Sequence, residues 1–155
     1  MYALVDCNNF FVSCERTLDP DLEGRPVVVL SNNDGCVVSR SKEAKDLGIP
    51  MAAPAFRYKE LFQKHDVKSF SAKFELYNYK SQQVINIAKS YVLDHEIYSI
   101  DELFLDLTGF KYIDIYEYCF KIKKEIDEKE NIPVSIGIAP TKTLCKVANR
   151  IVKEF

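Results

Sequence analysis

The stretch IYSIDELFLDL, residues 97–107, decides how the rest of the sequence is interpreted. Most of it is apolar, yet Asp101 and Glu102 stand near its centre. Apolar and aromatic residues in this density are typical of a strand pair or of one long bent strand. An isolated ionised carboxylate in such a strand is energetically costly unless it is paired or bound to a metal ion. We therefore expect a positive partner to face this acidic pair.

A third acid, Asp6, ends another apolar strand at residues 2–6. Side chains alternate across a strand, so Asp101 and Glu102 can reach one site only near a turn or bend. If the two strands are neighbours in one sheet, the carboxylates converge and repel one another. Two divalent cations that prefer oxygen ligands would relieve this repulsion. The residues alone leave an alternative open, in which the buried acids pair with Arg or Lys or cap a helix.

Composition sets the class of protein. The chain has 155 residues with 47% hydrophobic content, enough for one core or for one core with a small appended lobe. No apolar run approaches the length of a membrane span, and no basic leader with an apolar stretch opens the sequence, so we expect a cytoplasmic protein without membrane contact. The five cysteines have no Cys-x-x-Cys spacing, which predicts reduced thiols and neither disulfides nor a structural zinc site.

Hydrophobic periodicity predicts an α+β fold, with an antiparallel sheet and helices on one face. Residues 19–74 form an insert, which we expect to be a separate small lobe. Within the insert the patterns predict a hairpin over 26–38, a helix over 41–47 that stops at Gly48, and a helix starting near Pro54. Outside it they predict helices over 81–94 and about 115–126, a strand over 134–138 and a last helix from about Thr141, with apolar positions Leu144, Val147, Ala148 and Ile151.

Five motifs in order resemble those of the Y-family translesion DNA polymerases. They are DCNNFFVSCE (6–15), GRPVVV (24–29), EAKDLG (43–48), YSIDE (98–102) and VSIGIAPTKTLCKVA (134–148), and together they run from residue 1 to about 150. A further segment, LSNNDGC (30–36), is similar to the UmuC branch, the catalytic subunit of bacterial DNA polymerase V.

The resemblance implies the N-terminal palm and fingers of such an enzyme. Residues 1–18 and 75–155 would form a ferredoxin-like polymerase palm, and residues 19–74 a small α/β fingers domain. The family's thumb and little finger are absent from this sequence, so the portion alone would be weak or inactive. The implied function is error-prone, template-directed deoxynucleotidyl transfer in DNA repair and the SOS response of a bacterial cytoplasm.

For the active site, the resemblance implies catalytic, metal-binding carboxylates at Asp6, Asp101 and Glu102, with the backbone carbonyl of Cys7 as an additional ligand. The resemblance implies two Mg²⁺ ions at these residues, with Mn²⁺ as a substitute. In such a site one ion lowers the pKa of the primer 3′-hydroxyl, and the other holds the triphosphate and neutralises the leaving pyrophosphate.

Nucleotide contacts are implied at Phe10, Phe11, Lys45 and Lys142. Phe11 matches the steric gate, an aromatic ring that leaves no room for a ribose 2′-hydroxyl, and the two lysines match phosphate contacts. Position alone would favour a core aromatic and ordinary solvated lysines. Ser39, Lys42, Ser99 and Lys146 are further possible contacts or supports, although the family often carries Tyr at the position of Lys42.

The implied partners are a DNA primer-template and deoxynucleoside triphosphates, with a UmuD-like accessory protein and the sliding clamp for the full-length protein. The net charge of −2 suits this only if the basic DNA-gripping surfaces belong to the absent domains. Two rivals stay open. One is a non-enzymatic interaction module with a palm-like fold; the other is a nucleotide cyclase, which would explain neither the insert nor Phe11.

Overall fold

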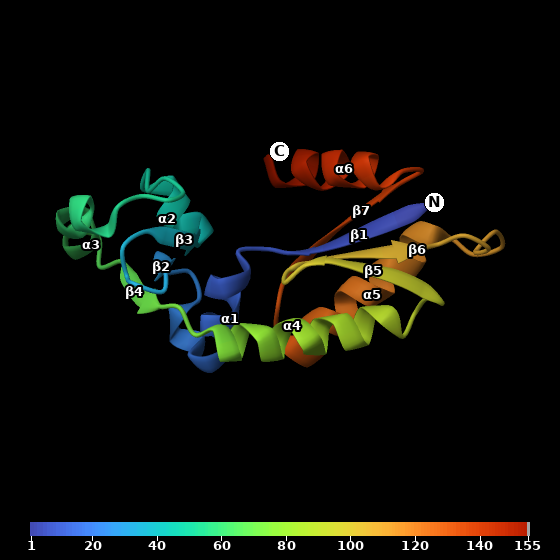
Figure 1. Cartoon of the computed structure of the whole chain (residues 1–155), viewed down its shortest axis with the longest axis horizontal. Coiled ribbons are helices and arrows are strands. Elements are labelled where there is room, and N and C mark those ends of the chain that lie inside the picture. The colour runs from blue at the N-terminus through green and yellow to red at the C-terminus, as the bar shows by residue number, and fades with distance from the viewer. Residues whose placement is uncertain (155) are drawn as a thin grey trace. The chain divides into compact units, whose positions relative to one another are not determined.

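The computed structural model describes residues 1–154, which form two compact units (Figure 1). The first unit comprises Met1–Asn8 and the chain from Asn78 onward, and the second comprises Asn9–Tyr77. Residues 9–18 and 75–77 therefore group with the second unit, whereas the sequence motifs place them with the palm. The assignment of palm and fingers roles to the units stays a prediction.

The first unit is built on a four-stranded antiparallel sheet. Its strands are β1 (Tyr2–Cys7), β5 (Asp94–Ser99), β6 (Glu102–Asp106) and β7 (Val134–Ala139), in the order β5-β6-β1-β7. The stretch 97–107 is a strand pair, as one of the two expected forms, and its chain reverses at Ile100–Asp101.

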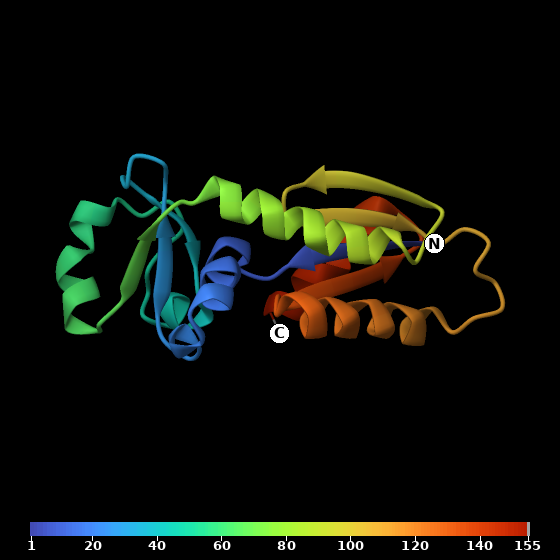
Figure 2. The ribbon, with the colours of Figure 1, turned by 90° about the horizontal axis from the view of Figure 1, so that it is seen from below.

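Helices cover both faces of this sheet. The long helices α4 (Phe74–Lys89) and α5 (Ile115–Glu130) lie on one face, and α6 (Lys142–Glu154) lies on the other (Figures 1 and 2). Strand alternation explains the division, because Leu4 and Phe104 are paired across β1 and β6 and pack with Cys145 of α6. The predicted α+β class with an antiparallel sheet is confirmed, but the expectation of helices on one face only is wrong, because α6 packs on the face opposite α4 and α5.

Three of the four apolar positions predicted for α6 are exposed. Its apolar residues Leu144, Val147 and Ile151 are about half exposed, whereas Cys145 and Asn149 are buried. The reason is a close approach of helix to strand: a Cβ added at Gly137 of β7 would lie 2.5 Å from the carbonyl oxygen of Cys145. Small and polar groups therefore fill this contact, and the Asn149 amide donates a hydrogen bond to the Leu4 carbonyl at 3.0 Å.

The second unit holds a smaller three-stranded sheet, in which β2 pairs antiparallel with β3 and parallel with β4. Ser41 caps the helix after β3 by accepting a hydrogen bond from the Ala44 amide, and Gly48 follows that helix with φ at +85°. The elements are α1 (Phe10–Leu18), β2 (Val27–Leu30), β3 (Val37–Arg40), α2 (Lys42–Asp46), α3 (Lys59–Lys64) and β4 (Lys68–Ser71), with 3₁₀ turns at Pro20–Leu22 and Ala55–Arg57.

Sequence patterns did not predict α1 or β4, and α4 begins at Phe74 where a helix was expected from residue 81. No disulfide joins any of the five cysteines in the part of the chain that the structure describes. Among the described residues, no helix is both long enough and apolar enough to cross a bilayer.

We predict that Gly137→Ala destabilises the first unit by about 2–3 kcal/mol, because the added methyl group would meet the backbone of α6. Urea unfolding followed by circular dichroism measures the loss. The control is Gly35→Ala in an exposed turn, where the atoms nearest to the new Cβ belong to the side chain of Asn33 and not to backbone. Equal stability of wild type and Gly137→Ala would contradict the close packing of α6 on β7.

Candidate active site

Strand register brings the three predicted carboxylates to one end of the sheet. Asp6 lies directly opposite Glu102 in the antiparallel pairing of β1 with β6. Asp101 occupies the turn just before β6, and its carbonyl oxygen accepts a hydrogen bond of 2.9 Å from the Cys7 amide. The expected position of the acidic pair beside a turn is confirmed, and the backbone of Cys7 is joined directly to that turn.

Ser99 connects the two acids of the pair. Its hydroxyl oxygen lies 2.8 Å from a carboxylate oxygen of Asp101 and 3.1 Å from one of Glu102. A hydroxyl carries a single proton, so it donates to one carboxylate at a time. Ser99 therefore draws both carboxylates toward one point, although consecutive residues of a regular strand would point apart.

Lysines of α6 supply positive charge to this end of the sheet. The Lys153 ammonium lies 2.8 Å from Asp6, and that of Lys146 lies 3.6 Å from Glu102 and 4.1 Å from the centre of the Tyr98 ring. These contacts lie around a hollow of about 350 Å³, which is lined by Leu4, Asp6, Glu102, Lys146, Asn149, Arg150 and Lys153. The structure thus contains ion pairs of the kind expected under the alternative in which these acids pair with Lys or Arg.

The electrostatics of Asp6 reflect its crowded surroundings. Burial raises the pKa of the Asp6 carboxyl above its usual value, the Lys153 ammonium opposes that rise, and the charges of Asp101 and Glu102 add to it. The mutual effect of the acids means that their charges are close enough to interact. Carboxylate oxygens are the ligands that Mg²⁺ and Mn²⁺ prefer, so the donor set fits a divalent ion in kind. Within residues 1–154, however, no three His, Cys, Asp or Glu side chains are already gathered as a metal-binding group.

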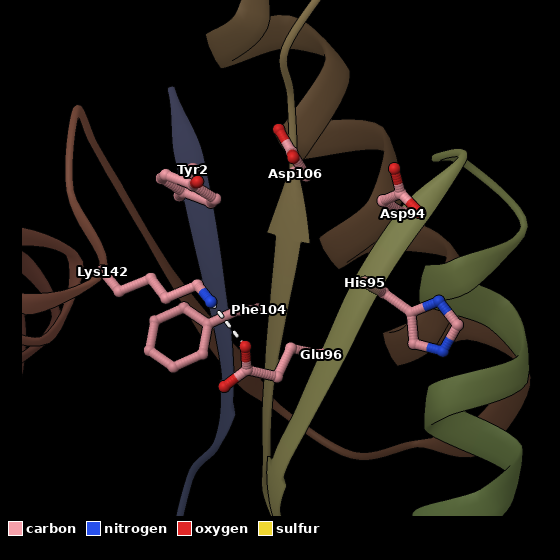
Figure 3. A pocket seen from close by; sticks show the side chains of 7 residues that line it. All are labelled: Tyr2, Asp94, His95, Glu96, Phe104, Asp106 and Lys142. Atoms are coloured by element: carbon pink, nitrogen blue, oxygen red, sulfur yellow. Dashed lines mark hydrogen bonds and ion pairs between the residues drawn. The ribbon is translucent and has the colours of Figure 1, made fainter.

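Lys142 lies in a different pocket from the carboxylates (Figure 3). Its ammonium pairs with Glu96 and lies 5.6 and 5.7 Å from the ring centres of Tyr2 and Phe104. The same pocket is lined by the acids Asp94 and Asp106. In this structure Lys146, rather than Lys142, is the motif lysine that contacts a candidate catalytic carboxylate.

The remaining predicted contacts lie in the second unit. Lys45 and Lys42 are exposed on α2, and the Lys45 ammonium lies 2.9 Å from the side-chain oxygen of Asn9. Ser39 is buried in β3, where its hydroxyl oxygen accepts a hydrogen bond of 3.4 Å from the Val12 amide. Phe10 is buried, so it presents little surface to a ligand. The nucleotide contacts assigned to these residues of the second unit stay a prediction.

Phe11 is part of a packed aromatic cluster. Its ring is half-buried and stacks on Tyr77, with ring centres 4.4 Å apart and planes inclined by 14°. Phe74 meets the Phe11 ring edge-on at 6.0 Å. The ring of the predicted steric gate is therefore held from two sides.

The sequence motifs did not single out Arg150 or Lys153, which line the hollow beside Asp6 and Glu102. A signal was present, because Lys146, Arg150 and Lys153 recur at intervals of four and three residues and so share one face of a helix. That face could be connected with the carboxylates only after α6 was placed against β1.

The chain has the fold of a part of the Y-family DNA polymerases. The insertion ternary complex of Dbh DNA polymerase aligns with a TM-score of 0.88 at 30% identity, over 97% of this chain and 45% of that chain. The crystal structure of DinB from Sulfolobus solfataricus aligns with a TM-score of 0.86 at 29% identity, over the same shares.

Within that class, the chain belongs to the impB/mucB/samB family, whose model matches residues 5–150. Protein UmuC of Salmonella typhimurium is 47% identical over 156 residues, which cover 100% of this chain and 37% of the relative. DNA polymerase IV of Metallosphaera sedula is 35% identical over 150 residues, which cover 92% of this chain and 42% of the relative. The chain thus spans about two fifths of the length of these relatives.

We predict that Ser99→Ala lowers the free energy of unfolding by about 1 kcal/mol in a chelating buffer, because two neighbouring carboxylates lose their shared donor. Thermal unfolding checks this. Ser90→Ala is the control. It removes an exposed hydroxyl that donates to the Ile87 carbonyl and should change the free energy of unfolding by less than about 0.5 kcal/mol. If both variants unfold like wild type, Ser99 does not restrain the acids.

Proposed function

We propose that this chain is the catalytic palm and fingers portion of an error-prone translesion DNA polymerase, which adds deoxynucleotides to a primer under the direction of a template. The observation that carries the proposal is the register of β1 on β6, which sets Asp6 opposite Glu102 beside the Asp101 turn. Membership of the impB/mucB/samB family supports the same assignment. The first unit would be the palm, and the second the fingers.

Asp6, Asp101 and Glu102, with the carbonyl of Cys7, would hold two Mg²⁺ or Mn²⁺ ions. When bound, the ions would lower the pKa of the primer 3′-hydroxyl and neutralise the charge of the leaving pyrophosphate. The protein's own contribution is to fix the carboxylates in advance. The backbone bond from Cys7 to Asp101 and the Ser99 hydroxyl do this.

The nucleotide would be recognised by charge at one end and by shape at the other. Lys146, Arg150 and Lys153 lie around the carboxylate hollow and provide positive charge for a triphosphate. Lys45 is exposed on α2 and is a further candidate phosphate contact. Phe11 would act as the steric gate, because a ring packed against Tyr77 cannot easily retreat from a 2′-hydroxyl.

The activity of the full-length protein belongs to this proposal as well. We infer a role in bacterial DNA repair and the SOS response, in the cytoplasm, with a UmuD-like accessory protein and the sliding clamp as partners. The relatives named UmuC and DNA polymerase IV support a polymerase of this kind. The 155-residue portion alone would have weak or no polymerase activity, since it spans about two fifths of such a relative.

We predict that the chain binds dATP only with Mg²⁺ or Mn²⁺ present, and that Asp101→Asn weakens this binding at least about tenfold, because a metal ligand is lost. Titration calorimetry with and without metal measures the affinity. Asp106→Asn is the matched control: it is also a strand-end acid, but its carboxylate binds Thr108, outside the cluster. Binding of dATP without metal, or equal weakening of dATP binding by both variants, would contradict the metal-site assignment.

Primer extension separates the polymerase from its rivals. We predict that the chain fused to the thumb and little finger of a family member extends a DNA primer with Mg²⁺, because the added domains supply the DNA grip. The same fusion carrying Asp101→Asn should be inactive. A fusion that binds DNA but never extends a primer would favour the non-enzymatic module, and conversion of a triphosphate to a cyclic nucleotide would favour the cyclase.

A further inference from the structure

Glu15 is the most deeply buried acid in the second unit, with 1% of its surface exposed. It lies on α1, one helical turn after Phe11, so both side chains leave the same face of the helix. Burying a carboxylate is costly unless its oxygens are paired. The oxygens of this buried acid, one helical turn from the predicted steric gate, therefore need hydrogen-bond or ion-pair partners.

Two donors satisfy the Glu15 carboxylate. The Tyr77 hydroxyl donates to one oxygen at 2.9 Å, and the Lys73 ammonium binds the other oxygen at 2.9 Å. Lys73 directly precedes α4 and Tyr77 lies in its first turn, where the Tyr77 amide bonds to the Lys73 carbonyl. One carboxylate of α1 thus fixes the start of α4 at two points.

The hydroxyl bond also determines where the Tyr77 ring lies. Tyr77 is fully buried, and its ring stacks on Phe11 at 4.4 Å. Burial raises the pKa of Tyr77, and the bond to Glu15 raises it further, so the hydroxyl keeps its proton and stays a donor at neutral pH. The contact chain therefore runs from Glu15 through the Tyr77 hydroxyl and ring to the face of Phe11.

We propose that Glu15 is a positioning residue for sugar selection, which holds the Tyr77 ring as a fixed backing for Phe11. The inference rests on the proposed function, because it takes Phe11 as the gate against a ribose 2′-hydroxyl. Without the carboxylate, the Tyr77 hydroxyl loses its buried acceptor and the ring gains freedom to shift. Phe11 could then yield to the extra oxygen of a ribonucleotide, while binding of a deoxynucleotide would change little.

The test compares dATP and ATP affinities in the presence of Mg²⁺ by titration calorimetry. Glu15→Ala and Tyr77→Phe should each reduce the preference for dATP by about threefold to tenfold, the value of one buried hydrogen bond. Glu15→Gln, which keeps an acceptor for the Tyr77 hydroxyl, should retain most of the preference. Tyr77→Phe keeps the buried ring, so it tests the inference even if Glu15→Ala fails to fold.

Two controls distinguish positioning from general stability. Glu130→Ala breaks the Lys80–Glu130 ion pair of the first unit, whose partners are also largely buried, and should leave the dATP preference unchanged. In a Phe11→Ala background, Glu15→Ala and Tyr77→Phe should have no further effect on the preference, because the residue through which they act is gone. An additive effect in that background would overturn the inference.

A second readout does not depend on nucleotide binding. Nuclear Overhauser effects between the Phe11 and Tyr77 rings should be strong in wild type and in Glu130→Ala, and weaker in Glu15→Ala and Tyr77→Phe. Unchanged ring contacts in both of those variants would overturn the positioning role whatever the nucleotide data show. Normal ring behaviour with no metal-dependent dATP binding in wild type would instead refute the proposed function.

Discussion

The pairing of β1 with β6 imposes the constraint on which the rest of the first unit depends. It sets Asp6 opposite Glu102, and opposed residues of antiparallel strands have Cβ atoms only about 4.5–5.5 Å apart. The like charges of the two carboxylates therefore oppose the pairing that brings these residues together. Positive charge on the same face lowers the cost of this register. The lysines of α6 supply that charge.

The side of α6 that faces the sheet is the side that carries these lysines. A helix that buried Leu144, Val147 and Ile151 would turn a different face toward the sheet than the one carrying Lys146 and Lys153. In the structure the apolar residues stay about half exposed, and the glycine of β7 lets the helix backbone come close to the strand. The side of α6 that brings lysines near Asp6 and Glu102 thus faces the sheet, and its apolar residues are left partly exposed.

Much of the fold could be predicted from the sequence, because its signals are local. The strand pair around Asp101 and the helix between Ser41 and Gly48 follow from alternation, capping and turn residues. The orientation of α6 and the parallel partner strand β4 could not be predicted, because contacts distant in the sequence determine them. The candidate site divides in the same way: motifs identified the carboxylates, whereas Lys153 and the partners of Glu15 became visible only in three dimensions.

The two units contain acids in opposite electrostatic conditions, and the contrast indicates which of them is suited to a ligand. Glu15 has a donor for each oxygen and no acidic neighbour among its hydrogen-bond partners, so an added cation would gain little there. Asp6 faces Glu102 and Asp101, so two acids repel its carboxylate while one lysine, Lys153, pairs with it. A divalent cation would offset more repulsion at Asp6 than Lys153 does, because it carries twice the charge and can bind several carboxylates at once. The satisfied acid is therefore suited to holding an aromatic ring in place, and the crowded acids are suited to exchanging a lysine for a metal ion.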